Sequence, residues 1–247
     1  MLSADCLRKR TEMDNTYVYY YSRLSERLQR EVYLPLLRAL QSHREKCALP
    51  FVAAEELERV LDCILLEHPL ISFYSEYSFR TFKDLVFSVE FKYLLNEEQQ
   101  RAVEEDIVSF ANSVASRARS VSDDPFMQVK SVYEQISRGV AYDTEYHSYS
   151  FNAAGVLYGR AVCLGISLGF KLISDIIGIP SFVVRGAHGG EPHAWSMVCL
   201  DGGWYPCDLT VGVCQTTAEE GVCYDGLCAL PNREMYKAWE SFPIPDL

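Results

Sequence analysis

The sequence predicts an α+β protein in which a mostly helical first part precedes a body of strands and tight turns. Of the 247 residues, 49% are apolar, which is enough for a folded core. The charge density falls after Arg138, because residues 1–138 carry 18 basic and 22 acidic residues while residues 139–247 carry 5 and 12. The hydrophobic spacing also changes along the chain, from the helical intervals of three and four to the alternation of strands.

The first part begins with two stripes of apolar residues at helical spacing. The stripe over residues 17–40 predicts a long helix, which Pro35 should kink or divide because proline has no N–H to donate. The stripe over residues 57–65 predicts a second helix that ends near His68. Such stripes are far more often part of a core than of a cofactor site.

A strand and a third helix follow. Residues 85–93 alternate between apolar and polar side chains, which is typical of a half-buried strand. Asn96 and Gln99 resemble a capping box and predict that a helix starts there.

A fourth helix start marks the predicted domain boundary. Asp124 is a capping residue followed by proline at the first helical position, a combination that opens helices. We therefore expect a mostly helical N-terminal region with a short strand segment over residues 1–124, and a second domain with a C-terminal extension over residues 125–247.

The second domain should run helix, strand, glycine-rich loop and hairpin. Residues 163–177 are strongly apolar and predict a helix, and residues 181–185 predict a strand. Residues 193–200 and 203–208 predict two strands joined at Asp201-Gly202, a pair that favours a hairpin turn.

Three residues of this domain have the character of a nucleophile, a base and an orienting carboxylate. Cys163 lies at a predicted helix start, where the helix dipole and free N–H groups favour the reactive thiolate. His193 opens the first hairpin strand and Asp208 closes the second, so we expect the two side chains to be neighbours across the ladder. A carboxylate that holds a histidine beside a cysteine is the arrangement of covalent acyl transfer.

Each of these residues also has a plain structural interpretation. A cysteine is commonly a small buried hydrophobe, a histidine at a strand start is commonly structural, and an aspartate commonly caps a turn. Only the order of the three residues together favours a catalytic triad.

Four blocks of this domain resemble the bacterial transglutaminase-like superfamily. They are Gly159-Arg160-Ala161-Val162-Cys163-Leu164-Gly165, Gly178-Ile179-Pro180, His193-Ala194-Trp195 and Trp204-Tyr205-Pro206-Cys207-Asp208-Leu209-Thr210. Together they cover about residues 125–210. The resemblance implies a papain-like core in which the helix that carries the cysteine packs on an antiparallel sheet. It also implies Cys163 as nucleophile, His193 as general base and acid, and Asp208 as orienting residue.

The chain departs from the family pattern at two positions. Ser196 stands where members often have asparagine, and Ile166 stands where many have an aromatic residue. The second oxyanion donor is not evident, and Asn152 is a weak candidate whose alternative is an ordinary loop residue. Trp195, together with Trp204, is better explained by hairpin packing that supports the site than by catalysis.

Two functions follow as hypotheses. The first is cysteine-dependent acyl transfer on amide bonds through a thioester, either peptide or isopeptide hydrolysis or transamidation between a glutamine carboxamide and an amine. The second is a transglutaminase-like module that is catalytically silent and binds a protein or peptide.

No cofactor or metal is expected. The last third of the chain contains His188 and five cysteines, but without a CxxC pair, which structural zinc sites usually contain. Scattered thiols are therefore favoured over a zinc-stabilised interaction protein, and disulfides remain an alternative. These cysteines are Cys199, Cys207, Cys214, Cys223 and Cys228.

The charge and the N-terminus limit the expected partners and location. A net charge of −11 repels phosphate backbones and anionic lipid, so we expect a protein or peptide substrate and neither nucleic acid nor a membrane as partner. The first fifteen residues lack the apolar region of a secretory signal, and nine cysteines form no regular framework. We therefore expect a cytoplasmic protein, or a secreted one if a leader has been removed.

Overall fold

The computed structural model describes residues 18–71, 74–216 and 236–238, and its contacts divide the chain into two compact units. The division falls between Val103 and Glu104, inside a helix and ahead of the boundary expected after residue 124. The elements of the N-terminal unit are η1 (Tyr21–Arg23), α2 (Glu26–Leu28), η2 (Gln29–Tyr33), α3 (Leu34–Gln41), β1 (Lys46–Ala53), α4 (Ala54–Glu67), β2 (Tyr74–Phe82), β3 (Leu85–Tyr93) and the start of α5 (Glu97–Val121).

The first predicted helix is shorter than its apolar stripe. Tyr17 lies outside the described residues, and the α-helix begins only at Glu26, where the Ser25 side chain caps it. The backbone amides of Tyr20 and Tyr21 instead donate to the buried carboxylate of Glu67. The start of the predicted helix is therefore wrong, because a tertiary contact takes the hydrogen bonds that a helix would use.

Pro35 divides the remaining helix without ending it. The turn just before it, η2, is π-helical, and the Leu34 amide bonds to the Gln29 carbonyl five residues back. Proline cannot donate to the fourth residue before it, and a wider turn accommodates its ring. The helix then continues as α3.

A three-stranded antiparallel sheet with the order β1-β3-β2 completes this unit. Strand β3 matches the prediction, whereas β1 and β2 were not predicted. In β1, Pro50 lies at a register shift between Ala48 and Val52, and an internal proline normally argues against a strand. The strand is held by burial of Cys47, Leu49 and Val52.

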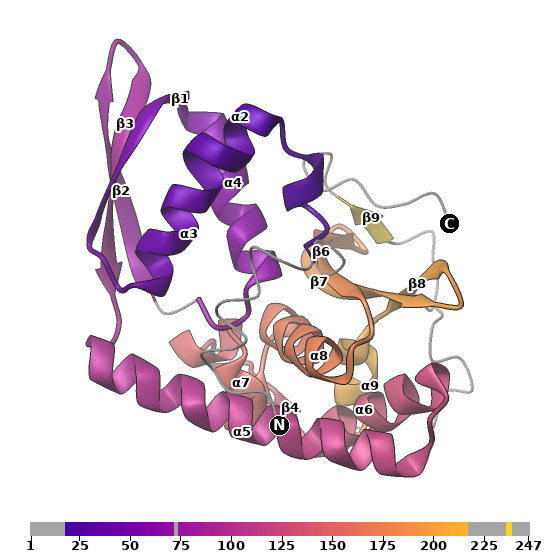
Figure 1. Cartoon of the computed structure of the whole chain (residues 1–247). Helices are drawn as coiled ribbons and strands as arrows, with labels where there is room; N and C mark the ends of the chain where they lie inside the picture. Colours follow the sequence, from indigo (N-terminus) through magenta and orange to yellow (C-terminus); the bar gives the residue numbers. More distant parts are fainter. Residues whose placement is uncertain (1–17, 72–73, 217–235, 239–247) are drawn as a thin grey trace. The chain divides into compact units, whose positions relative to one another are not determined.

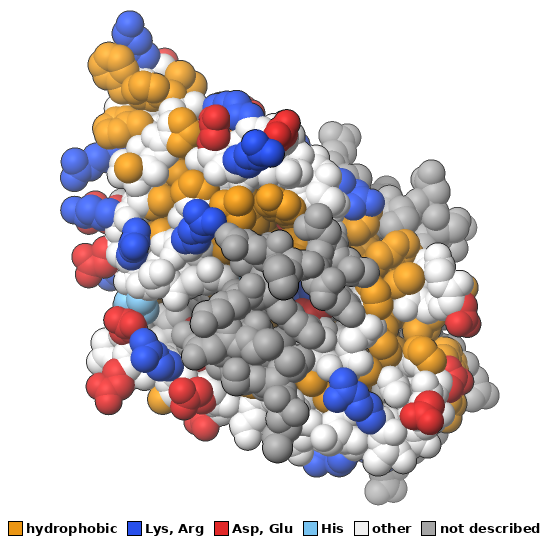
Figure 2. Space-filling view, in the orientation of Figure 1, with side chains coloured by type: hydrophobic (Ala, Val, Ile, Leu, Met, Phe, Trp, Pro, Cys, Tyr) orange, Lys and Arg blue, Asp and Glu red, His pale blue; other side chains and the backbone are white. Residues whose placement is uncertain are grey.

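Strands β2 and β3 meet in a tight turn at Lys83 and Asp84, both with positive φ. Apolar side chains gather near the end of this hairpin (Figure 2), where Phe51 and Phe82 are more than half exposed.

The C-terminal unit contains the end of α5 and two sheets. Strands β4 and β5 pair in parallel, and β8-β7-β6-β9 form an antiparallel sheet. Its further elements are α6 (Pro125–Gly139), β4 (Ala141–Tyr142), η3 (Ser148–Phe151), α7 (Ala154–Leu157), β5 (Arg160–Ala161), α8 (Cys163–Ile177), β6 (Ser181–His188), β7 (Glu191–Leu200), β8 (Gly203–Cys207), α9 (Leu209–Thr216) and β9 (Tyr236–Ala238).

Helix α8 is the centre of this unit and packs on strands β6 and β7 (Figure 1). Its residues are buried on almost all sides, and it ends at Gly178, whose φ of 92° is left-handed. The expected mixed helix and sheet fold, with the cysteine helix on an antiparallel sheet, is therefore confirmed. One detail differs: Gly186 belongs to β6, so the predicted glycine-rich loop shrinks to a turn at Gly189 and Gly190.

The hairpin of β7 and β8 turns at Asp201 and Gly202, as predicted. Their φ values are 49° and 79°, which is the conformation that a two-residue hairpin turn requires. Among the helices described for residues 18–216, none is sufficiently long and apolar to cross a membrane.

Candidate active site

Cys163 is the first residue of α8. Val162 before it is extended and provides no side-chain cap, so the first amides of the helix have no helical partner. Gly165, one turn in, lets another segment approach: a Cβ there would meet the carbonyl oxygens of Ser150 and Asn152. The loop before α7 therefore packs directly against the helix end that carries the thiol.

His193 and Asp208 meet across the hairpin. His193 Nε2 lies 2.8 Å from Asp208 Oδ2, and Asp208 Oδ1 accepts the Thr210 amide at 3.0 Å. The carboxylate is thus fixed at both oxygens. The imidazole packs parallel to the buried Trp195 ring, with centroids 6.1 Å apart.

The structure also brings Cys163 to His193. The thiol and the imidazole share a hydrogen bond, and because Nε2 faces Asp208, Nδ1 is the ring nitrogen left for the sulfur. The sulfur also accepts hydrogen bonds from the backbone amides of Ala194 and Leu164. The three residues therefore form one connected chain of contacts.

These contacts shift the proton equilibria of the pair. Burial alone would lower the pKa of His193, but hydrogen bonds with Asp208 and Cys163 outweigh it and raise that pKa to about 9. Burial would raise the pKa of Cys163, but the His193 hydrogen bond and charge, with the two amides, lower it. The arrangement favours a thiolate beside an imidazolium.

The two supporting residues predicted from sequence have structural contacts. Asn152 is buried, and its Oδ1 accepts the Ala154 amide at 2.9 Å. Trp195 is 1% exposed and supports the face of His193. The related residue Trp204 is only partly buried and packs edge-on against Phe182, with centroids 4.9 Å apart.

Sequence reasoning missed Tyr142 as a site residue. Its hydroxyl oxygen accepts a hydrogen bond from the Cys163 amide, although the tyrosine precedes the cysteine by 21 positions. Nothing in the spacing of Tyr142 indicated that the chain returns to Cys163.

The remaining described cysteines do not form a metal cluster. Within residues 18–71, 74–216 and 236–238, no group of three histidine, cysteine or acidic side chains could hold a metal ion. Cys199 is half-buried, Cys207 is buried and Cys214 is exposed, and Cys223 and Cys228 lie outside the described residues.

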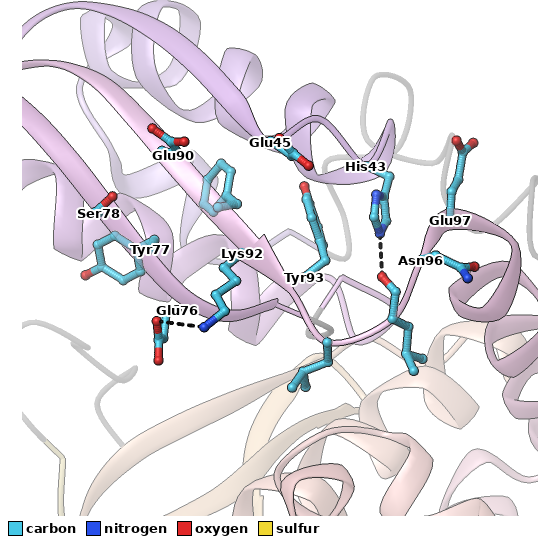
Figure 3. A pocket seen from close by; sticks show the side chains of 13 residues that line it. His43, Glu45, Glu76, Tyr77, Ser78, Glu90, Lys92, Tyr93, Asn96 and Glu97 are labelled. Carbon is cyan, nitrogen blue, oxygen red and sulfur yellow. Dashed lines mark hydrogen bonds and ion pairs between the residues drawn. The ribbon is translucent and has the colours of Figure 1, made fainter.

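The N-terminal unit has an open groove of about 710 Å³ (Figure 3). His43 stacks on Tyr93 at 3.8 Å between ring centroids, and Lys92 pairs with Glu76 at 3.6 Å on its wall. None of the three predicted triad residues lines it.

A family model and several solved structures are similar to parts of this chain. Residues 112–209 match the family model of the transglutaminase-like superfamily. A solved structure described as a TGase is 19% identical, with a TM-score of 0.42 over 62% of this chain and 48% of its own.

Two further solved structures are similar. The periplasmic domain of TgpA from Pseudomonas aeruginosa, bound to ethylmercury, is 19% identical, with a TM-score of 0.38 over 55% of this chain and 59% of its own. A proposed cysteine protease from Cytophaga hutchinsonii is 12% identical, with a TM-score of 0.38 over 55% and 61%. The chain thus spans about half to three fifths of these proteins. Curated proteins gave no match.

Proposed function

Because residues 112–209 match the family model of the transglutaminase-like superfamily, we propose that the chain is an enzyme of cysteine-dependent acyl transfer on amide bonds. The observation that supports this most strongly is the chain of contacts from Cys163 through His193 to Asp208. A buried thiol with a merely structural role has no need of an imidazole held by a carboxylate.

The proposed reaction has two steps. The Cys163 thiolate attacks the carbonyl carbon, and His193 gives its proton to the departing amine, which leaves a thioester. Water or a second amine then attacks the thioester while His193 takes its proton, and the sulfur leaves as thiolate. Asp208 remains ionised and holds the imidazole in place throughout.

Several contacts prepare the enzyme for the first step. The Ala194 and Leu164 amides donate to the sulfur, and Asp208 stabilises the imidazolium at 2.8 Å. These contacts favour an ionised nucleophile before substrate arrives and a protonated acid for the leaving amine.

Casein and a fluorescent alkylamine test the proposal together. We expect either amine incorporation into casein or release of new amino groups from it, and the product formed distinguishes transferase from hydrolase. Cys163→Ala and His193→Ala should each abolish the product, whereas Cys199→Ala, a thiol in the neighbouring strand, should retain it. Activity that survives in Cys163→Ala would refute the proposal, and an inert wild-type protein would favour the silent binding module.

A further inference from the structure

Tyr142 is held beside the first turn of α8 by the parallel pairing of β4 and β5. It lies opposite Ala161 in the register, and the next residue, Asp143, donates its amide to the Ala161 carbonyl at 3.0 Å. Ala161 is two positions before Cys163. The backbone of Tyr142 is therefore fixed within reach of the nucleophile.

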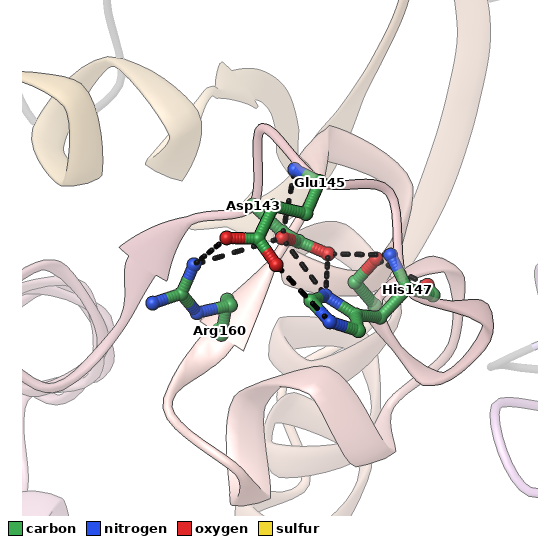
Figure 4. Close-up of polar contacts among 5 residues, drawn as sticks. Asp143, Glu145, His147 and Arg160 are labelled. Carbon is green, nitrogen blue, oxygen red and sulfur yellow. Dashed lines mark hydrogen bonds and ion pairs between the residues drawn. The ribbon is translucent and has the colours of Figure 1, made fainter.

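Asp143 reinforces this position (Figure 4). Its fully buried carboxylate accepts the amides of Glu145 and His147 at 3.1 and 2.7 Å, and Arg160 of β5 lies 3.9 Å away. The loop that follows Tyr142 is thus closed onto the strand that precedes Cys163. A rigid support of this kind is what a precisely placed polar group requires.

The hydroxyl of Tyr142 lies at the backbone amide of Cys163, and a reacting carbonyl oxygen would need a hydrogen bond from that same amide. The Cys163 amide, at the free end of α8, donates to the tyrosine oxygen. Because that oxygen accepts, the phenolic proton remains to be donated elsewhere. Burial, with nearby Cys163 and Tyr146, raises the pKa of Tyr142 to about 12, so the hydroxyl keeps its proton at neutral pH.

We propose that Tyr142 is a catalytic residue whose hydroxyl is the second oxyanion donor, beside the Cys163 amide. This inference rests on the proposed function. When the sulfur bonds to the carbonyl carbon, the electron pair of the C=O π bond moves to oxygen. The oxyanion accepts hydrogen bonds from the amide and from the phenol, and both are released when the C=O bond re-forms and the amine leaves. No proton is transferred from Tyr142.

The resting contact requires a small exchange of partners. The substrate oxygen takes the Cys163 amide hydrogen from the tyrosine oxygen and receives the phenolic hydrogen from the same side chain. If Tyr142 merely filled this position in the resting state, its removal would instead speed the reaction. The two roles therefore predict opposite effects for Tyr142→Phe, which removes one oxygen and keeps the ring.

Two reactions of the same sulfur separate this role from a structural one. Acylation by p-nitrophenyl acetate passes through an oxyanion, whereas alkylation by iodoacetamide is a displacement at carbon and does not. We expect Tyr142→Phe to slow acylation of Cys163 by on the order of a hundredfold and to leave its alkylation rate unchanged. Both rates are read at Cys163 by peptide mass spectrometry in the full chain.

Tyr146→Phe is the matched control, because Tyr146 is a neighbouring but exposed tyrosine, and it should change neither rate. Acylation that is unchanged or faster in Tyr142→Phe, with normal alkylation, would overturn the assignment and leave the proposed function intact. An equal loss of both reactions would assign Tyr142 a structural role. Wild-type protein in which Cys163 is alkylated but not acylated would refute both proposals.

Discussion

At the scale of single residues, the chemistry depends on where two protons lie. His193 keeps its proton up to about pH 9, and Cys163 loses its proton below the ordinary thiol range. Each shift stabilises the other, because the thiolate and imidazolium attract each other and Asp208 anchors the pair. Neither residue would have these properties alone.

The pair predicts a pH profile that depends on the leaving group. Amide turnover should be nearly constant from the lowered pKa of Cys163 upward and should fall above about pH 9, where His193 has no proton for the departing amine. Acylation by p-nitrophenyl acetate should not fall there, because its leaving group departs without protonation. Rates measured for both reactions from pH 5 to 10 test this. An amide rate that rises through about pH 8.5, as for an unperturbed thiol, would contradict the ion pair.

The residue scale is also where sequence reasoning was strongest and weakest. The proximity of Cys163, His193 and Asp208 could be predicted because each lies at the end of an element with a local signal. Tyr142 was not found, because its contact with Cys163 depends on the pairing of two short strands 19 positions apart in register. Strands of two residues have no periodic pattern to detect.

At the scale of elements, the end of α8 is positioned by a close approach. A Cβ on Gly165 would lie 2.9 Å from the Asn152 carbonyl oxygen and closer still to that of Ser150. Both neighbours are backbone atoms, which cannot rotate away as a side chain can. The glycine therefore sets the distance between the loop and the helix that carries Cys163.

Gly165→Ala should consequently destabilise the protein by about 1–3 kcal/mol through overpacking, and should slow acylation of Cys163 by moving the helix end. Gly139→Ala is the control, since a Cβ at that helical position meets nothing within 4 Å and alanine favours helices. Urea unfolding of both variants measures the effect. Equal free energies of unfolding for Gly165→Ala and Gly139→Ala would contradict this prediction, because the loop would then move away from the added Cβ without destabilising the fold.

Elements were predictable where a turn or cap residue marked their ends. Gly178 ended α8 and Asp201-Gly202 set the hairpin. In contrast, β1 contains Pro50 at a register shift, so its sequence pattern does not predict a strand. Strands β1 and β2 exist because each pairs with one edge of β3, which is a tertiary cause.

At the scale of the whole molecule, the ionisation of acidic side chains makes the free energy of unfolding depend on pH. Among the 34 acidic side chains, that of Asp143 is fully buried. Burial alone would raise the pKa of Asp143. Hydrogen bonds from Ser150 and from the amides of His147 and Glu145 outweigh burial and lower that pKa to about 2. A group whose pKa falls on folding stabilises the fold above its unfolded value of 3.8. That contribution is lost as the pH falls through about 2.

Asp143→Asn should therefore lower the melting temperature at pH 7, and its difference from wild type should shrink as the pH falls from 4 to 2. The other carboxylates are common to both proteins and cancel in the comparison. Asp123→Asn, at an exposed position, should show no such pH dependence. A difference that stays constant down to pH 2 would mean that the Asp143 charge contributes nothing.

The division of the whole chain was harder to predict than its elements. The composition shift placed the boundary near the start of α6, but contacts divide the chain inside α5. A long helix gives no local signal of which residues each part of it packs against. Sequence pattern thus identified the helix and left the division open.

The central claim, that Cys163 is an ionised nucleophile paired with His193, is tested most directly by brief iodoacetamide labelling of the folded protein near pH 6. An unperturbed thiol with a pKa of about 8.5 is less than about one per cent ionised there, so Cys163 should label first. Cys214 is the internal control, because it is more exposed but burial and the charges of Asp208 and Cys163 raise its pKa. We expect His193→Ala to slow labelling of Cys163 and to leave Cys199 unchanged. Labelling of Cys163 that is slower than that of Cys214 and indifferent to His193 would contradict the claim.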